Sequence, residues 1–212
     1  TVDLLISQSD LSICNEIVLP IRHYLMAMPS TTVANIQMIY SHPQSLAQCR
    51  NFLERSFPQA QQIASSSNSA AVTDMKASAL PAAAIAPKRA ATLYDVEIIE
   101  AGVQDSATNE TRFVVLARED HPRTGVDKTS ICFAFTADAP GALHGALATF
   151  ARRNINLAKI ESRPTKETLG EYFFLVDCAG HRDDELVQEA LKELAEQVSM
   201  FKVLGSYPKW KS

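Results

Sequence analysis

The sequence is poor in three features: long apolar runs, blocks of like charge and clustered cysteines. No apolar run approaches the ~20 residues that a membrane-spanning helix needs, and no charged and then apolar leader opens the chain. We therefore expect a cytoplasmic protein without a membrane partner. The net charge is −4 and no basic segment stands out, so we do not expect nucleic acid as a partner.

The four cysteines, Cys14, Cys49, Cys132 and Cys178, are scattered without a C-x-x-C pair or paired histidines. This spacing predicts free, mostly buried thiols in a reducing compartment, with a zinc site or a redox motif as the weaker alternative. The glycine-rich nucleotide motifs G-x-x-x-x-G-K-[ST] and G-x-G-x-x-G are also missing. We expect neither a metal nor an organic cofactor.

The composition is that of a globular protein that buries a core. Hydrophobic residues make up 46% and charged residues 21% of the 212 positions. A polar stretch that contains Pro122 and Gly125 separates two halves and is typical of a connector. We place one domain at residues 1–120 and a second at 128–212.

Short apolar runs alternate with helical patterns in the first half. We predict strands at residues 16–26, 36–40, 60–64, 82–86, 96–99 and 111–116, one helix that begins at Pro43, and another over 69–80. Strands that alternate with helices indicate an α/β layer with a largely parallel sheet.

The second half shows a clearer pattern. Strands are predicted at residues 130–136, 157–161, 172–178 and 200–204. One helix is predicted over 142–153, and another follows the acidic residues Asp183 and Asp184. The order β-α-β-β-α-β is the ferredoxin-like split unit.

Two polar segments, Tyr40–Gln44 and Ser65–Ser69, each follow a predicted strand. Exposed N–H groups at a helix start suit a carboxylate ligand, and ligands of open α/β sheets collect beyond the carboxyl ends of strands. The alternative is ordinary helix capping, with Ser41 as one of the caps.

A third segment, Asn109–Phe113, places Thr111 beside Arg112. An arginine can bind a carboxylate bidentately, and a threonine can donate a proton or a hydrogen bond to a leaving oxygen. The alternative is a strand start with a surface arginine.

Two segments of the second half also carry polar groups. Gly141–His144 begins a helix, where small residues let backbone N–H groups face a ligand carboxylate, and Glu161–Pro164 ends a strand. The alternative for Glu161 and Arg163 is a surface ion pair.

Taken together, these segments resemble one family. Ser41-His42-Pro43-Gln44, the serines at 65–67, Ala83–Ala86 and Thr111-Arg112-Phe113 occur in the order and spacing of a prephenate dehydratase. Gly141-Ala142-Leu143, Asn156-Leu157 and Glu161-Ser162-Arg163-Pro164 are similar to the signatures of its regulatory ACT domain, and residues 202–208 to its usual ending. The resemblance covers nearly the whole chain. It departs from the family at Ser67-Asn68-Ser69, where a Ser-Thr or Thr-Ser pair is usual.

The resemblance implies an α/β fold class: a partial two-lobed, periplasmic-binding-protein-like lobe, followed by a ferredoxin-like βαββαβ ACT domain. Most of the first catalytic lobe would precede Thr1. The implied activity converts prephenate to phenylpyruvate with loss of water and carbon dioxide, in phenylalanine biosynthesis and without a cofactor.

The resemblance also implies site residues. Thr111 would donate a proton or a hydrogen bond to the departing hydroxyl, Arg112 would hold the charge of the substrate, and Phe113 would wall its ring. The residues expected to line the substrate cleft are Ser41, His42, Gln44, Ser66 and Ser67.

The ACT domain would bind L-phenylalanine between two subunits of at least a homodimer and so allow feedback inhibition. The implied ligand residues are Gly141, Ala142, Leu143, Asn156, Leu157, Glu161, Ser162 and Arg163. Two alternatives stay open: an L-phenylalanine-binding regulatory protein without catalysis, and a dehydratase-derived enzyme for another small anionic substrate. Arogenate, the aminated relative of prephenate, also remains as a substrate.

Overall fold

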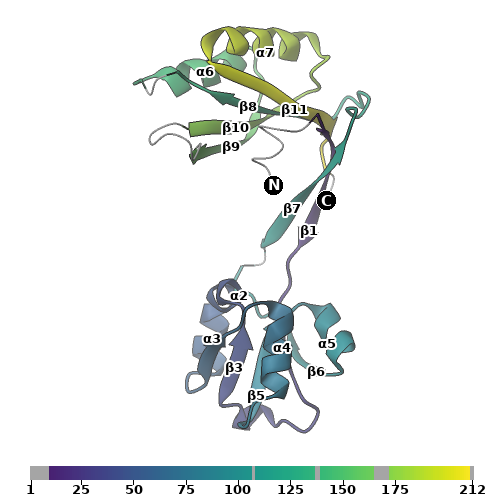
Figure 1. Ribbon diagram of the computed structural model, residues 1–212, viewed down its shortest axis with the longest axis vertical. Helices are drawn as coiled ribbons and strands as arrows, with labels where there is room; N and C mark the ends of the chain where they lie inside the picture. Colours follow the sequence, from purple (N-terminus) through teal and green to yellow (C-terminus); the bar gives the residue numbers. More distant parts are fainter. Residues whose placement is uncertain (1–9, 107, 137–138, 165–171, 211–212) are drawn as a thin grey trace. The chain divides into compact units, whose positions relative to one another are not determined.

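The computed structural model describes residues 10–106, 108–136, 139–164 and 172–210. The chain divides into two compact units (Figure 1). We name residues Leu19–Thr111 the first unit, and residues 1–18 together with 112–212 the second unit. The chain therefore passes between the units twice, between Val18 and Leu19 and between Thr111 and Arg112.

The first unit is built on a five-stranded sheet with the order β4-β3-β5-β2-β6. These strands are β4 Gln61–Ala64, β3 Met38–Ser41, β5 Ala82–Ala86, β2 Tyr24–Ala27 and β6 Glu97–Ala101. β3 pairs in parallel with β4 and β5, but β2 pairs antiparallel with both β5 and β6. The expected largely parallel sheet is therefore confirmed except at β2, which runs against the other strands.

Helices cover both faces of this sheet. The apolar residues of α2 Pro43–Gln48 and α3 Arg50–Ser56 pack with Leu25 and Ile85 on one face. Those of α4 Asn68–Lys76 and α5 Lys88–Tyr94 pack with Met26 and Ala84 on the other face. Because β5 is covered on both sides, all five of its residues are buried.

Several elements of the first half of the chain differ from the sequence prediction, and the helix expected from Pro43 is divided into α2 and α3. The strand expected over 16–26 is divided into β1 Ser12–Pro20 and β2, since Pro20 cannot donate a ladder hydrogen bond. The helix α5 was not predicted, because only Ala90 and Ala91 of its seven residues are buried and the apolar periodicity is weak. A short 3-10 helix at Val33–Asn35 completes the unit.

The second unit contains a four-stranded antiparallel sheet with the order β11-β8-β10-β9. The strands are β11 Met200–Pro208, β8 Asp127–Ala134, β10 Tyr172–Ala179 and β9 Leu157–Pro164. The helices α6 Ala142–Ala151 and α7 Glu185–Gln197 pack on one face around Ile131, Phe133 and Val176. The chain order β8-α6-β9-β10-α7-β11 confirms the predicted ferredoxin-like unit.

The other face of this sheet carries a strand from the N-terminal part of the chain. Ile13 of β1 packs with Cys132, Leu175 and Leu204, and β1 also pairs with β7 Glu110–Ala117. The approach of β1 is so close that a Cβ atom at Gly205 would clash with the backbone of Ile13. Only glycine fits at this position, which also has a φ angle of +148°.

The cysteines behave as the sequence predicted. All four are free, and Cys49, Cys132 and Cys178 are buried. Burial raises the pKa of each of these three thiols to about 12, so they stay protonated and unreactive at neutral pH. In the described ranges, no helix is long and apolar enough to span a membrane.

Candidate active site

The polar loops of the first unit gather at one edge of its sheet. β3, β4 and β5 run in parallel, so their carboxyl ends share that edge. The backbone N–H of Ser65, just after β4, donates to the carbonyl oxygen of Ser41 at the end of β3. The two polar segments therefore lie side by side.

Asn68, the residue that departs from the family pattern, joins these two loops. Its Oδ1 accepts hydrogen bonds from Ser45 Oγ at 3.0 Å, Ser41 Oγ at 3.2 Å and the backbone N–H of His42 at 3.3 Å. Ser41 is fully buried, and its hydroxyl also lies 2.7 Å from the carbonyl oxygen of Ile85. The Ser41 hydroxyl thus has its partners inside the protein.

The other residues expected in the substrate cleft lie at helix starts. His42 caps α2, with Nδ1 accepting from the backbone N–H of Gln44, and Ser67 caps α4 by accepting from Ala70 N. His42, and not Ser41, is therefore the cap of α2. Gln44 and Ser66 are exposed. Contact of these residues with a substrate stays a prediction.

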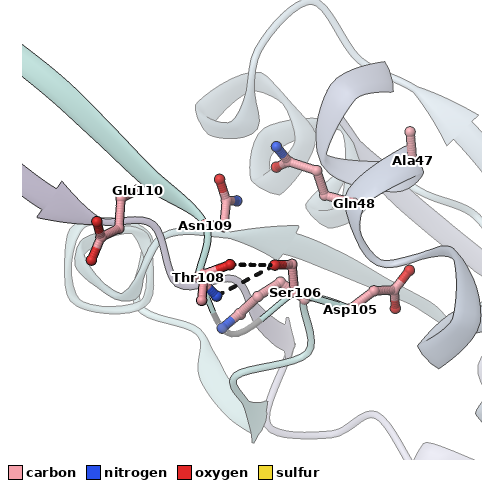
Figure 2. A pocket seen from close by; sticks show the side chains of 8 residues that line it. Ala47, Gln48, Asp105, Ser106, Thr108, Asn109 and Glu110 are labelled. Atoms are coloured by element: carbon pink, nitrogen blue, oxygen red, sulfur yellow. Dashed lines mark hydrogen bonds between the residues drawn. The ribbon is translucent and has the colours of Figure 1, made fainter. Parts of the chain in front are cut away.

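A cavity of about 350 Å³ opens at the same edge of the first unit (Figure 2). It is lined by Ala47, Gln48, Gln104, Asp105, Ser106, Thr108, Asn109 and Glu110. Its volume lies within the usual range for small-molecule sites, roughly 300–1,000 Å³. Glu110 immediately precedes Thr111 in the sequence, so the cavity reaches the segment in which the family resemblance implies a donor to the substrate.

His23 fixes two glutamines of this cavity. The His23 side chain is almost fully buried, with Nε2 at 2.8 Å from Gln48 Oε1, while its backbone N–H donates to Gln104 Oε1 at 3.0 Å. His23 Nδ1 has no hydrogen-bond partner among the described residues. Because both amide oxygens are taken, each glutamine is left with its NH₂ group as a donor.

Asn109 adds a third amide to the cavity. Its Nδ2 is buried and has no hydrogen-bond partner within the described part of the chain. A buried donor without an acceptor costs free energy, so an NH₂ group in this state needs a water molecule or a ligand oxygen. By contrast, Asp105 has a structural role: its two carboxylate oxygens accept from Asn51 N and Phe52 N and cap α3.

Three residues that shape this site, His23, Gln48 and Gln104, were not predicted from the sequence. One signal was available for Gln48, because it lies four residues, about one helical turn, after Gln44 on a helix that was predicted. His23 and Gln104 lie in short connections without a recognisable pattern. Only the fold brings them to the end of α2.

The Thr111-Arg112-Phe113 segment lies in β7, where neighbouring side chains point to opposite faces of the strand. Thr111 and Phe113 share one face and are exposed, with Phe113 at 50%. Arg112 points the other way, within the second unit, toward protein acceptors. Adjacent positions in a strand cannot direct both Thr111 and Arg112 at one small ligand from the same face.

Arg112 belongs to a group that we name the charge cluster: Glu16, Arg112, Lys128, Ser130, Asp177 and Tyr207. The Arg112 guanidinium lies 2.6 Å from Glu16 Oε2 and 2.6 Å from Asp177 Oδ2, and it also donates to the Tyr207 hydroxyl. Lys128 Nζ lies 2.7 Å from Glu16. Two cations thus balance two carboxylates that are 1% and 5% exposed.

The pKa values in the charge cluster reflect this balance. Burial alone would raise the pKa of Glu16, but the hydrogen bonds from Lys128 and from the backbone of Trp210, with the nearby cations, hold it below its ordinary value. Burial and the Asp177 carboxylate raise the pKa of Tyr207, so the phenol stays protonated. The cluster is therefore charged and paired at neutral pH.

The residues expected to bind L-phenylalanine lie at the start of α6 and along β9. Gly141 is the N-cap of α6 with a φ of +87°, and its lack of a side chain leaves the first turn without a side-chain cap. Leu143 packs against the same core as Phe135 and Phe174, whose ring centroids lie 5.7 Å apart. Leu157 is half-buried at the start of β9, while Asn156 is exposed.

β9 is an edge strand of its sheet. Glu161 pairs with Lys159 at 2.7 Å and with Arg163 at 2.6 Å, as in the ion-pair alternative. Ser162 is exposed. Roles of these residues in ligand binding stay predictions.

The first unit is an α/β domain with a polar cavity at the strand ends, and the second contains a βαββαβ unit. Within the described residues, no group of three or more His, Cys, Asp and Glu side chains is placed to hold a metal ion. Residues 1–121 match the family model "Prephenate dehydratase", and residues 130–196 match "ACT domain". The chain belongs to the prephenate dehydratase family.

Relatives and a solved structure agree with this membership. A bifunctional chorismate mutase/prephenate dehydratase of Aquifex aeolicus is 44% identical over 209 residues, which are 99% of this chain and 57% of the relative. The chain thus spans little more than half the length of that relative. A prephenate dehydratase of Lactococcus lactis is 40% identical, and the alignment covers 98% of this chain and 75% of the length of that relative.

The solved structure is a prephenate dehydratase of Arthrobacter aurescens in complex with L-Phe. It superposes on this chain with a TM-score of 0.86 and 33% sequence identity. The superposition covers 98% of this chain and 69% of the Arthrobacter chain. The similarity extends over both units of the fold.

Proposed function

We propose that this chain acts in the prephenate dehydratase reaction, with the cavity of the first unit as part of the substrate site. One observation carries the proposal: three amide groups, from Gln48, Gln104 and Asn109, face one cavity beside the Thr111 segment in a member of this family. Amide NH₂ groups donate to carboxylate oxygens, and prephenate has two carboxylates.

The proposed reaction needs no redox partner. The ring carboxylate leaves as carbon dioxide, and its bonding electron pair enters the ring as the hydroxyl departs as water. The hydroxyl oxygen takes up one proton. Because aromatisation drives both losses, the protein has to place the two carboxylates and supply a hydrogen-bond or proton donor to the hydroxyl.

In this proposal Thr111 is the donor to the hydroxyl and Phe113 walls the ring. Ser41, His42, Gln44, Ser66 and Ser67 form the neighbouring edge. Gln48, Gln104 and Asn109 hold the carboxylates. The amides bring no charge, so in this proposal they bind the anionic substrate by directed hydrogen bonds.

We further propose that the second unit binds L-phenylalanine, since the Arthrobacter prephenate dehydratase was solved in complex with L-Phe. The open first turn of α6 at Gly141–Leu143 suits the ligand carboxylate, and Phe135 and Phe174 offer an apolar wall. Asn156, Leu157, Glu161, Ser162 and Arg163 complete the site. The edge position of β9 suits pairing with a second copy in a homodimer, in the cytoplasm.

The test is phenylpyruvate formation from prephenate by the purified chain, with Thr111→Ala and Thr111→Ser as variants. Loss of a proton or hydrogen-bond donor predicts a rate lower by roughly 10²–10⁴-fold in the alanine variant. The serine variant keeps a hydroxyl and should retain most of the activity. Equal activity of wild type and Thr111→Ala would refute the donor assignment.

A regulatory protein without catalysis is the second candidate. It is favoured by the observation that protein acceptors occupy Arg112, the residue that the family resemblance assigns to the substrate. In that case calorimetry would show L-phenylalanine binding while phenylpyruvate formation stays at the uncatalysed rate. Arogenate or another small anion as substrate would be detected as turnover of that compound in place of prephenate.

A further inference from the structure

We propose that Arg112 is a positioning residue, which ties the strand that carries Thr111 to the sheet of the ACT domain and transmits the binding of L-phenylalanine to Thr111. This inference deepens the proposed function and rests on its L-phenylalanine site. It gives Arg112 a role different from the one that the family resemblance implies.

Each nitrogen of the Arg112 guanidinium lies beside a protein oxygen, and two of the three, Nη1 and Nη2, donate hydrogen bonds. Nε lies beside Glu16 on β1, Nη1 beside Asp177 on β10, and Nη2 beside the hydroxyl of Tyr207 on β11. These acceptors are 1%, 5% and 0% exposed, so a substrate carboxylate would have to displace buried protein groups. Arginine suits such a position because its planar fork can serve several acceptors at once.

Two of the three partners of Arg112, Asp177 and Tyr207, lie on strands of the ACT sheet. Ser130 on β8 lies opposite Asp177 on β10 in the strand register, and Ser130 Oγ donates to Asp177 Oδ1 at 2.5 Å. Ser130 Oγ also lies 2.5 Å from the Tyr207 hydroxyl. A change in the relative position of β8, β10 and β11 therefore alters the acceptors of Arg112 together.

The link from Arg112 to Thr111 is covalent. The two residues are neighbours in β7, and the boundary between the two compact units falls between them. A shift of the Arg112 backbone is passed directly to Thr111, since the peptide bond that joins them is planar and stiff. A charge cluster whose members share several partners favours discrete arrangements over gradual deformation, as a transmitting element requires.

The chain contains its own reporter for this cluster. Trp210 is the one tryptophan in the sequence. Its backbone N–H donates to Glu16 Oε1 at 2.9 Å, so the residue is anchored beside the charge cluster. At 39% exposure its emission is sensitive to changes in solvation.

The experiment combines calorimetry of L-phenylalanine binding with Trp210 fluorescence in wild type, Arg112→Lys and Tyr207→Phe. Arg50→Lys is the matched control, because Arg50 forms an exposed pair with Glu54 in the first unit. In wild type we expect a saturable emission shift whose midpoint equals the calorimetric Kd. We also expect L-phenylalanine to weaken prephenate binding by a factor in the roughly 5–150-fold range of coupled sites.

Arg112→Lys keeps the charge but cannot reach all the acceptors, so it should bind L-phenylalanine while losing the emission shift and bringing the coupling factor close to one. Tyr207→Phe removes one acceptor and should reduce both, and it provides the test if Arg112→Lys does not fold. The Arg50→Lys control should behave as wild type.

Full coupling and an unchanged shift in both cluster variants would overturn the inference, as would L-phenylalanine binding to wild type without any shift. If calorimetry shows no L-phenylalanine binding to wild type, the effector site itself is refuted, and the inference with it. Because binding and coupling are measured separately, failure of the L-phenylalanine site can be distinguished from failure of the role assigned to Arg112.

Discussion

The cavity of the first unit and the charge cluster of the second unit handle polar groups in opposite ways. The cavity presents three neutral amides beside the carboxylates of Asp105 and Glu110, and Asn109 Nδ2 has no partner among the described residues. The cluster buries two carboxylates and pairs both with cations. The difference shows that the arginine of the Thr-Arg-Phe motif can serve protein carboxylates, since both buried carboxylates of the cluster pair with Arg112.

Loss of the Arg112 charge should produce the largest difference in stability between the two units. Arg112→Gln leaves Glu16 and Asp177 buried without their shared cation, which should destabilise the second unit by roughly 3–5 kcal/mol. Amide hydrogen exchange should show faster opening of β10 and little change in β5. Arg50→Gln, at an exposed pair, is the control and should alter neither strand.

A second substitution tests how tightly β1 lies on the ACT sheet. Gly205→Ala would bring a Cβ atom against the backbone of Ile13 and force an unfavourable φ, so we expect a loss of roughly 1–3 kcal/mol or more. The loss should again be confined to the second unit. Exchange rates in β11 and β1 that match wild type would mean that this close approach does not exist in solution.

The stability of the second unit should also depend on pH, with a smaller effect than the two substitutions above. The pKa of Glu16 is lower in the folded protein than its ordinary value of 4.5. The stabilisation from Glu16 is therefore fully present above that ordinary value and is lost as the pH falls through the lower, folded pKa. Exchange protection in β8 and β10 should decline with acid over this range in wild type. Glu16→Gln should flatten the decline.

Much of the fold could be predicted from the sequence, because apolar periodicity and turn residues are local signals. The βαββαβ order of the second half followed from period-two strands such as β8 and from the apolar face of α7. The antiparallel direction of β2 and the short helix α5 could not be predicted. Strand direction depends on pairing between distant segments, and α5 buries too few residues to leave a pattern.

The site was predictable only where it coincides with a motif. The segment Asn109–Phe113 was recognised, and two of its residues line the cavity. His23 gave no signal, because its importance comes from hydrogen bonds to Gln48 and Gln104, which lie 25 and 81 positions away in the sequence. The environment of Arg112 was equally hidden, since its acceptors lie on three other strands.

Calorimetry of prephenate binding to wild type, Asn109→Asp and Arg112→Lys, without L-phenylalanine, would decide which region holds the charge of the substrate. A carboxylate at position 109 removes the unpaired donor and repels the ligand, so Asn109→Asp should weaken binding by at least about tenfold. Arg112→Lys should bind prephenate as wild type does. The reverse result, with binding lost in Arg112→Lys and kept in Asn109→Asp, would contradict the amide site and return Arg112 to the substrate.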